Sequence, residues 1–421
     1  MYIKKFIHAF HVIITNPTLI KQYGKQLASC LKMWTAFFLL LFVKKRLYNR
    51  NIWIVREKGT EARDNGFFFY KHIREKHPEI HAYYIISKDS ADYSKVSQYN
   101  NIIRLNSLKH FMFSLAAKVS ASSQPYGALP YPSVFLFSIS KSLRRKDQIV
   151  VFLQHGIIHN ELPHSYDYNK TKFDLFCCAS DRERRFIQEI HGYPDDNIKT
   201  VGMCRFDNLI KSDKAKKVIL IMPTHRTWLH SSDTMKEATE KEKKDFIESV
   251  YYKAYASLLS NDSLVSFSRR NDYKIVFYPH YALQSYIGCF MQYENDVVTI
   301  ADREHYDVQK LLVDSAILVT DYSSVFFDFA YMEKPIVYYQ FDKEQFRKNH
   351  FKQGYFDYIT DGFGPVYESE KEIVNEIKII VENQCVMNDI YYKRIKGFFR
   401  FHDTNNCSRT FDEVYRKAIS K

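Results

Sequence analysis

The stretch AILVTDYSSVFFDFAYMEKPIVYYQFD, residues 316–342, contains an apolar run, a helical segment and a second apolar run in succession. The runs at 316–320 and 335–342 are short and rich in β-branched and aromatic residues, which favours strands that are buried on both faces. The segment VFFDFAYME between them, residues 325–333, has the pattern of a helix. Two strands joined by a helix form the building unit of a parallel sheet, so this stretch predicts a doubly wound α/β fold.

Short apolar runs of the same kind recur along the chain, with helical segments between them. They predict ten strands, at residues 51–56, 82–87, 118–123, 149–156, 174–180, 217–223, 274–280, 297–302, 316–324 and 335–342. A chain of 421 residues is long enough for two or three domains at ~150 residues each. Polar residues between 205 and 215 divide the runs into two halves, so each half is expected to form its own sheet.

The composition is that of a globular protein, because 46% hydrophobic and 16% aromatic residues supply enough apolar surface for hydrophobic cores. A formal net charge of +13 favours an anionic partner, which could be nucleic acid, a membrane surface, or a phosphorylated donor or polymer. No zinc-finger, helix-turn-helix or RNP-type motif accompanies the charge, so nucleic acid is not an expected partner. Seven cysteines without a CxxC pair indicate a reducing compartment.

The most apolar stretch, MWTAFFLLLFV at residues 33–43, is followed directly by Lys44, Lys45 and Arg46. This run is too short to cross a bilayer, which takes ~20 apolar residues. Basic residues beside an apolar face are typical of a segment that lies on an anionic membrane surface. Residues 1–46 are therefore expected to form amphipathic helices that attach the protein peripherally to the cytoplasmic face of the membrane. The alternative is a helix that packs on the first domain without lipid.

Histidines follow two of the predicted strands. His155 precedes Gly156 after the run IVVFLQ, and His280 ends KIVFYPH. Ligands of doubly wound folds bind at the carboxyl ends of the strands, where an imidazole can act as a general base and a glycine lets the backbone approach a ligand. The alternative for each histidine is a turn residue that caps its strand.

Hydroxyl and guanidinium groups follow two further strands. Thr224 and Arg226 come after the run KVILIMP and can hold phosphate oxygens, Arg226 in a bidentate manner. Ser323 and Ser324 open a helical segment, whose first N–H groups and dipole favour a diphosphate. The alternatives are a surface charge for Arg226 and simple helix capping for the two serines.

Acidic residues are candidates for binding ribose or polyol hydroxyls. They are Asp302, Asp328 and Asp342. Asp328 lies one turn inside its helical segment, so a structural role is the alternative for it. No cluster with the spacing of metal ligands occurs, so no metal site is expected.

Taken in order, several segments resemble the CDP-glycerol glycerophosphotransferase family of teichoic acid and capsule synthesis. The resemblance covers residues 51–410 and rests on QHGII, on the G-x-x-R-x-D pattern of Gly202, Arg205 and Asp207, on PTHR, on YPH and on the block TDYSSVFFDFAYMEKPIVYYQFD. The long block is highly specific, whereas the short motifs become informative through their order.

The resemblance implies a GT-B-like fold, in which two Rossmann-like domains surround a cleft. The expected organisation is a membrane-associating helical segment at 1–46, an acceptor domain at 47–205, and a CDP-donor domain with closing C-terminal helices at 206–421. No cofactor is implied, because a CDP-polyol is the donor substrate.

The resemblance also implies three groups of site residues. The catalytic residues would be His155 and His280. The ligands of the donor phosphates would be Thr224, Arg226, Ser323 and Ser324. Further ligands of donor or acceptor would be Arg205, Asp207, Asp302, Asp321 and Asp328. Some residues depart from the family pattern, such as Cys204 where a proline is common and His225 where a tryptophan is common.

The implied reaction transfers a polyol phosphate, glycerol phosphate first, from CDP-glycerol or CDP-ribitol to a hydroxyl of a lipid-linked or polysaccharide acceptor. The hydroxyl attacks the phosphorus that carries the polyol, His155 takes the proton, and CMP leaves while Arg226, His280 and the helix at Ser323 neutralise charge. Two alternatives stay open at this point. One is a GT-B glycosyltransferase that uses a nucleotide sugar, and the other is a noncatalytic protein that binds an anionic polymer at the membrane.

Overall fold

The computed structural model describes residues 17–125, 140–210, 215–229 and 237–421. Residues 1–16 of the predicted membrane-associating segment therefore lie outside the described part of the chain.

The chain forms two compact units. The first unit contains the chain up to residue 155, residues 172–177 and residues 407–421, and the second unit contains residues 156–171 and 178–406. Each unit is built on a parallel sheet, as the alternating pattern of the sequence predicts.

The first sheet has the strand order β3-β2-β1-β4-β5-β6-β7. Its strands are β1 (Trp53–Arg56), β2 (Ala82–Ile86), β3 (Ile102–Arg104), β4 (Val119–Ser122), β5 (Ile149–Phe152), β6 (Leu175–Cys178) and β7 (Ile198–Thr200). The order of the first six is that of Rossmann sheets. Pairing is parallel, with Ile54 opposite both Tyr83 and Ser120. The boundary between the two units passes through β6, after Cys177.

Helices connect the parallel strands, because a parallel pair cannot be joined by a tight turn. Those of the first half are α3 (Asn65–Lys76), α4 (Tyr93–Ser97), α5 (Leu108–Ala116), α7 (Tyr168–Thr171) and α8 (Asp181–His191). Side-chain caps mark several of their starts, and Ser107 accepts the backbone N–H of His110 at the start of α5.

The second sheet has the order β10-β9-β8-β11-β12-β13, which repeats the Rossmann arrangement. Its strands are β8 (Val218–Ile221), β9 (Lys274–Phe277), β10 (Val298–Ile300), β11 (Ile317–Thr320), β12 (Ile336–Tyr339) and β13 (Val366–Tyr367). Alternate residues of β8, β9, β11 and β12 enter two different cores, as the period of two in a strand requires. Ile219 and Ile221 of β8 belong to one core, whereas Leu220 belongs to the other.

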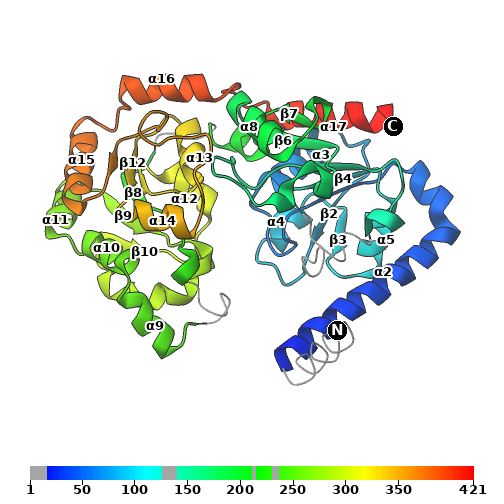
Figure 1. Cartoon of the computed structure of the whole chain (residues 1–421), viewed down its shortest axis with the longest axis horizontal. Helices are drawn as coiled ribbons and strands as arrows, with labels where there is room; N and C mark the ends of the chain where they lie inside the picture. Colours follow the sequence, from blue (N-terminus) through cyan, green and yellow to red (C-terminus); the bar gives the residue numbers. More distant parts are fainter. Residues whose placement is uncertain (1–16, 126–139, 211–214, 230–236) are drawn as a thin grey trace. The chain divides into compact units, whose positions relative to one another are not determined.

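Helices cover both faces of the second sheet (Figure 1). The first core includes residues from α9 (Glu240–Ile247), α10 (Val250–Leu259), α11 (Asp262–Arg270) and α15 (Glu370–Glu382). The second core includes residues from α12 (Val308–Asp314), α13 (Val325–Tyr331), α14 (Lys343–Asn349) and α16 (Asp389–Phe398). The unit is therefore a three-layer α/β/α sandwich.

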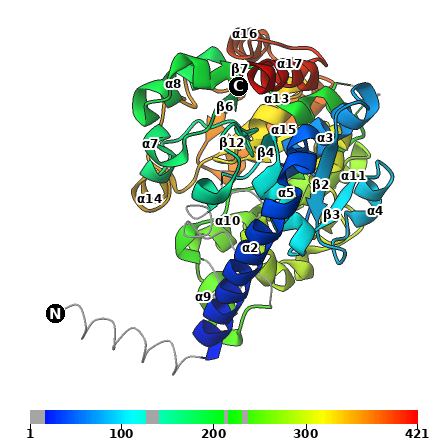
Figure 2. The ribbon, with the colours of Figure 1, turned by 90° about the vertical axis from the view of Figure 1, so that its right-hand side faces the viewer.

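In the described part of the chain, the long helix α2 (Pro17–Asn49) precedes the first sheet and runs beside α5 (Figure 2). Met33, Ala36 and Leu40 on one side of α2 are at most 2% exposed and join the core that α5 helps to form. Over Leu27–Asn49 the helix is long and apolar enough, by length and composition alone, to cross a membrane. The run at 33–43 was expected to be too short to span, with Lys25 and Lys32 limiting its extension, whereas the apolar part of the helix is longer.

The last helix, α17 (Asn406–Ser420), belongs almost entirely to the first unit. Phe411 stacks on His77 with ring centroids 3.5 Å apart and packs at 5.5 Å from Trp53 of β1. The division into units therefore differs from the predicted domains 47–205 and 206–421 in two places. Residues 156–171 and 178–205 belong to the second unit, and residues 407–421 return to the first.

Candidate functional site

His155 follows β5, and its ring pairs with the carboxylate of Asp64, which is not among the predicted site residues. Nδ1 of His155 lies 2.7 Å from Oδ2 of Asp64. An ionised carboxylate can only accept, so Nδ1 donates, and in the neutral ring Nε2 carries the lone pair. The His155 side chain is 63% exposed and that of Asp64 only 13%. A largely buried carboxylate thus orients a solvent-accessible imidazole.

The backbone next to His155 is held by the loop that begins α3. Gln154 has a φ of +63°, a left-handed conformation that is uncommon for residues with a side chain. Nδ2 of Asn65 donates to the carbonyl of Gln154 at 2.9 Å. Asp64 is also the N-cap of α3 and accepts the N–H of Asn65 at 2.7 Å. One loop therefore positions both the ring and the preceding backbone of His155.

A buried carboxyl group, Glu57, supports this loop. It follows β1, is 1% exposed, and accepts backbone N–H groups from Arg63, Asp64 and Phe67 at 2.7–3.0 Å. Burial, with a smaller contribution from the Asp64 carboxylate, raises the pKa of Glu57 to about 8. Glu57 ties β1 to the first turn of α3, which carries the partner of His155.

Gly156 is the glycine expected to allow close approach of the backbone. A Cβ atom added at Gly156 would lie 2.8 Å from Oγ of Ser324, a distance that real Cβ atoms do not adopt. A larger residue at position 156 would therefore displace the hydroxyl of Ser324, which lies directly before α13.

Residues after β8 and β11 meet in the second unit, as their positions at adjacent strand ends predict. The backbone N–H of Thr224 donates to Oδ1 of Asp321 at 2.8 Å. Both residues are buried, Thr224 at 6% and Asp321 at 0% exposure. Asp321 also accepts the N–H of Tyr322 at 2.5 Å. Asp321 thus connects the loop after β8 with the loop after β11, and its carboxylate is buried.

Arg226 is completely buried and its donors face protein groups. Its Nε and Nη2 donate to the two oxygens of Asp342 at 2.6 and 2.9 Å, and Nη1 lies 2.9 Å from Asp321. Nη1 also donates to the carbonyl of Thr224 at 2.7 Å. Although burial acts to lower it, the two carboxylates raise the pKa of Arg226. The Nε and Nη2 donors of Arg226, which were expected to bind phosphate, are occupied by Asp342. The structure therefore favours a role for Arg226 in positioning the Thr224 and Asp321 loops.

His280 stands at the start of the 3-10 segment η5 (Tyr281–Cys289) and caps it. Its Nδ1 accepts the backbone N–H of Ala282 at 3.3 Å. The ring of His225 stacks on it, with centroids 4.3 Å apart and planes at 24°. His350, at the end of α14, meets His225 edge-on at 4.7 Å and 79°. Three half-buried imidazoles from three elements therefore form one cluster.

The two serines before α13 differ from ordinary helix caps. Ser324 occupies the N-cap position with φ −60° and ψ −7°, and its side chain makes no capping hydrogen bond. Both side chains are half-buried, and within the described ranges no hydrogen bond is recorded for either hydroxyl. Simple capping, the alternative for these serines, therefore does not explain Ser324.

Two acidic residues of the predicted site have structural partners. Arg205 donates to both oxygens of Asp328 at 2.6 and 2.7 Å in a buried pair. Asp207 accepts the backbone N–H and the side-chain amide of Asn406, at 2.8 and 2.7 Å. Gly202, which opens the G-x-x-R-x-D pattern, has a φ of +85° and packs directly against Asn406. This pattern thus builds a structural junction within the second unit.

Asp302 follows β10 and binds its own turn. Its Oδ1 accepts the N–H groups of Glu304 and His305 at 2.7 and 2.9 Å, and Oδ2 lies 2.8 Å from Nδ1 of His305. The hydrogen bonds to His305 contribute to lowering the pKa of Asp302, against an opposing effect of burial.

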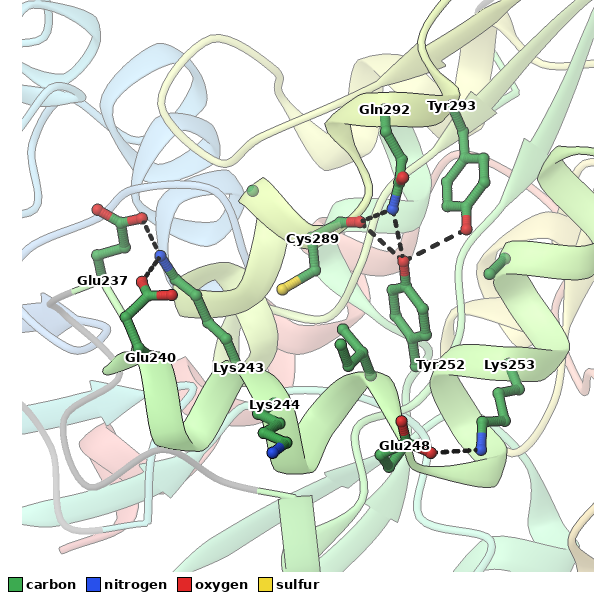
Figure 3. Close-up of a pocket in the computed structure, with 13 residues that line it drawn as sticks. Glu237, Glu240, Lys243, Lys244, Glu248, Tyr252, Lys253, Cys289, Gln292 and Tyr293 are labelled. Carbon is green, nitrogen blue, oxygen red and sulfur yellow. Dashed lines mark hydrogen bonds and ion pairs between the residues drawn. The ribbon is translucent and has the colours of Figure 1, made fainter.

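A surface pocket of about 720 Å³ lies elsewhere, between α9, α10 and η5 (Figure 3). Lys243 pairs with Glu237 and Glu240 at 2.7 and 3.0 Å, and Tyr252 hydrogen-bonds to Gln292. None of the predicted site residues lines this pocket. Among the residues that the structure describes, no group of three His, Cys, Asp or Glu side chains is arranged to hold a metal ion.

Known proteins resemble this chain over most of its length. It is 32% identical over 374 residues to the minor teichoic acid biosynthesis protein GgaB of Bacillus subtilis, which covers 87% of this chain and 40% of GgaB. It is 28% identical over 214 residues to a teichoic acid poly(glycerol phosphate) polymerase of Bacillus spizizenii, covering 50% of this chain and 48% of the polymerase. The chain thus spans less than half the length of these relatives.

Solved structures support the fold. A structure of the wall teichoic acid polymerase TagF matches with a TM-score of 0.65 and 16% identity, covering 94% of this chain and 98% of that one. The predicted GT-B-like fold is confirmed by this match. A family model described as CDP-Glycerol:Poly(glycerophosphate) glycerophosphotransferase matches residues 36–416. The chain therefore belongs to the CDP-glycerol:poly(glycerophosphate) glycerophosphotransferase family.

Proposed function

We propose that this protein transfers glycerol phosphate from CDP-glycerol to a hydroxyl group of a teichoic acid or related surface polymer and releases CMP. Membership of the glycerophosphotransferase family supports the reaction class. The names of the relatives support a polymer of the teichoic acid type as the acceptor. Ribitol phosphate is the alternative polyol phosphate, and a donor panel distinguishes the two.

The observation that carries the proposal is the hydrogen bond between Nδ1 of His155 and Asp64. It leaves the lone pair of the ring on Nε2, which is the form of histidine that can accept a proton. In the proposed reaction, Nε2 takes the proton of the acceptor hydroxyl. A bond forms between that oxygen and the phosphorus that carries glycerol, and the anhydride bond to CMP breaks.

We assign the diphosphate of the donor to the second unit. The hydroxyls of Ser323 and Ser324 and the ring of His280 are the proposed contacts, together with the hydroxyl of Thr224. Phosphoryl transfer depends mainly on such positioned donors, because the charge spreads over the phosphate oxygens as the anhydride bond breaks. Arg226 acts indirectly in this proposal, through its contacts with the Thr224 carbonyl and Asp321. The reaction is proposed to need no metal ion or cofactor, and a chelator control tests this.

We propose that α2 attaches the protein to the cytoplasmic face of the membrane without crossing it. One side of the helix is occupied by the core shared with α5. The other side exposes large apolar residues: Leu27, Leu31, Trp34, Phe38, Leu39, Leu41, Phe42 and Val43. Lys44, Lys45 and Arg46 follow at once and would meet anionic headgroups.

The experiment is a donor panel with the purified full chain. CDP-glycerol, CDP-ribitol and UDP-sugars are each incubated with acceptor polymer, and the released nucleotide is identified by chromatography. CMP release from CDP-glycerol, retained in the presence of a chelator, supports the proposal. Release of UDP or UMP from a UDP-sugar would instead support a glycosyltransferase. Polymer binding without turnover of any donor would support a noncatalytic binding protein.

A further inference from the structure

The imidazole of His280 is held in one tautomer by its own backbone. The N–H of Ala282 points at Nδ1 of His280, 3.3 Å away. A backbone N–H can only donate, so Nδ1 must be the acceptor and the ring proton must be on Nε2. Adding a second proton would place it on Nδ1 and break this bond, which disfavours the charged ring.

The neighbouring rings disfavour the charged form as well. His225 stacks on His280 with centroids 4.3 Å apart, and His350 contacts His225 at 4.7 Å. Two imidazolium rings at such distances repel, so the cluster takes up its protons in separate steps that belong to the group rather than to one ring. His350 also accepts a backbone N–H at Nδ1, from Thr227 at 3.2 Å.

The other charged and titratable groups around the cluster come from the elements that pack against it. Arg226 follows His225 and is paired with Asp321 and Asp342, after β11 and β12. Tyr281 packs on the His280 ring at 4.3 Å, and Arg347 lies on α14 near His350. The two carboxylates are both paired with Arg226.

We infer that His280 works as a neutral imidazole with its proton on Nε2, and that His225 is the positioning residue that holds it in this state. The two histidines of the proposed reaction then have opposite tautomers. His155 carries its proton on Nδ1 and can accept one at Nε2, whereas His280 donates from Nε2. Such a difference in environment divides the roles of base and hydrogen-bond donor between two residues of the same type. The role of His280 as donor rests on the proposed function, but its tautomer does not.

Nuclear magnetic resonance of the ¹⁵N-histidine-labelled full chain, without substrate, tests the tautomer directly. Long-range ¹H–¹⁵N spectra distinguish the two neutral forms and the charged form, and a His280→Asn sample assigns the signal. We expect the Nε2–H form of His280 at pH 7. We also expect it to become charged only at a lower pH than an imidazole in a model peptide. An Nδ1–H form or a charged His280 at pH 7 would overturn the inference.

The coupling to His225 is tested with His225→Phe, which keeps an aromatic ring but cannot be charged. The pH at which His280 becomes charged should then rise by roughly one unit, because the repulsion from a second imidazolium is gone. His81→Phe is the matched control and should leave the His280 titration unchanged. An unchanged titration in His225→Phe would overturn the coupling. If His225→Phe does not fold, the spectrum of the unaltered protein still tests whether His280 is neutral with its proton on Nε2.

A kinetic comparison separates positioning from general stability. His225→Ala removes the stack and should lower kcat by ~10-fold or more, and His225→Phe should restore part of that loss. An equal loss in both variants would contradict positioning by stacking. If the protein turns over no CDP-polyol while His280 shows the expected tautomer and coupling, the proposed function fails and the assignment of the cluster remains.

Discussion

Arg226 and Asp342 form a bidentate ion pair inside the second unit, with N–O distances of 2.6 and 2.9 Å and side chains no more than 4% exposed. Four aromatic rings lie within 6 Å of the guanidinium, those of Tyr251, Tyr322, Phe341 and Phe346. A buried charge of this kind is stable only while its partners remain. The Arg226–Asp342 ion pair therefore fixes the PTHR segment, residues 223–226, in the second unit. The backbone N–H of Thr224 is fixed in addition by its hydrogen bond to Asp321.

Removing the guanidinium should destabilise the second unit strongly. We expect Arg226→Met to lower the free energy of unfolding by ~3–5 kcal/mol, because Asp342 and Asp321 lose their counter-charge. Urea unfolding measures this. Arg269→Met, which breaks the exposed pair with Asp296, is the control and should leave the free energy of unfolding nearly unchanged, because solvent screens exposed pairs. A fully stable Arg226→Met protein with weakened donor binding would instead indicate direct contact with phosphate.

Asp64→Asn should impair catalysis while leaving the fold intact. Asparagine can still cap α3, but its side chain no longer orients the His155 ring as a carboxylate does. We expect kcat to fall by ~100-fold or more with little change in donor affinity, similar to the loss in His155→Ala. Asp89→Asn, at an exposed position of the same unit, should have normal kinetics. Normal turnover in Asp64→Asn would remove this carboxylate from the mechanism.

The buried Glu57 predicts a particular dependence of stability on pH. Its pKa is raised from 4.5 to about 8 in the folded protein, so the folded state holds a proton that the unfolded state has lost. The contribution of Glu57 to the free energy of unfolding is fully present below about pH 4.5. It is lost as the pH rises through about 8, which lowers the free energy of unfolding by up to ~4 kcal/mol. The difference between wild-type and Glu57→Gln unfolding free energies, followed from pH 4.5 to 8.5, isolates this effect. A difference that does not change with pH would show that Glu57 is ionised in the folded protein.

Membrane attachment is best tested by point substitutions on α2. Deleting residues 1–46 would also remove Met33, Ala36 and Leu40 from the core with α5, so loss of vesicle binding would be ambiguous. Phe38→Asp with Phe42→Asp changes side chains that are 57% and 87% exposed. We expect this pair of changes to reduce co-sedimentation with anionic vesicles and to leave donor hydrolysis in solution unaffected.

Val386→Asp is the control for the membrane test, since Val386 is 72% exposed but lies in the second unit. It should not alter vesicle binding. Equal binding by wild-type protein and the Phe38, Phe42 double variant would place the attachment elsewhere.

The fold could be predicted from the sequence because strands buried on both faces are continuous apolar runs. All ten predicted strands are present, and the structure adds β3, β7 and β13. These three have only two or three residues each, too few to show a periodic pattern. The return of α17 to the first unit depends on the contact of Phe411 with His77 and Trp53, which no local pattern reveals.

The candidate site was only partly predictable. Strand ends indicate where His155, Thr224 and His280 lie, because carboxyl ends of parallel strands carry the ligands in such folds. Strand ends do not reveal which charged side chains pair. The pairing of Asp64 with His155 was therefore not predicted, and Arg226 was expected to bind phosphate rather than Asp342. The signal for Asp64 was an N-cap aspartate directly before the helical segment NGFFFYKHIREK, but its pairing with a residue 91 positions away appears only in three dimensions.

The serines before α13 allow a sharp test of donor binding. Ser324 makes no capping hydrogen bond, so Ser323→Ala with Ser324→Ala should change Tm little and raise the KM for the donor by ~10-fold or more. Ser369→Ala is the matched control, because Ser369 caps α15 through the N–H of Glu372. That change should cost ~1 kcal/mol of stability with normal donor kinetics. A lower Tm with normal KM in the double variant would make the serines structural.

The mass of the product tests the central claim most directly. Purified full-length protein is incubated with CDP-glycerol and a teichoic acid acceptor, with His155→Ala as the control, and the acceptor is analysed by mass spectrometry. The account predicts an increase by one or more glycerol phosphate units, one CMP for each unit added, and no product with His155→Ala. An acceptor that gains a sugar from a nucleotide sugar, or that stays unchanged while the protein binds it, would contradict the account.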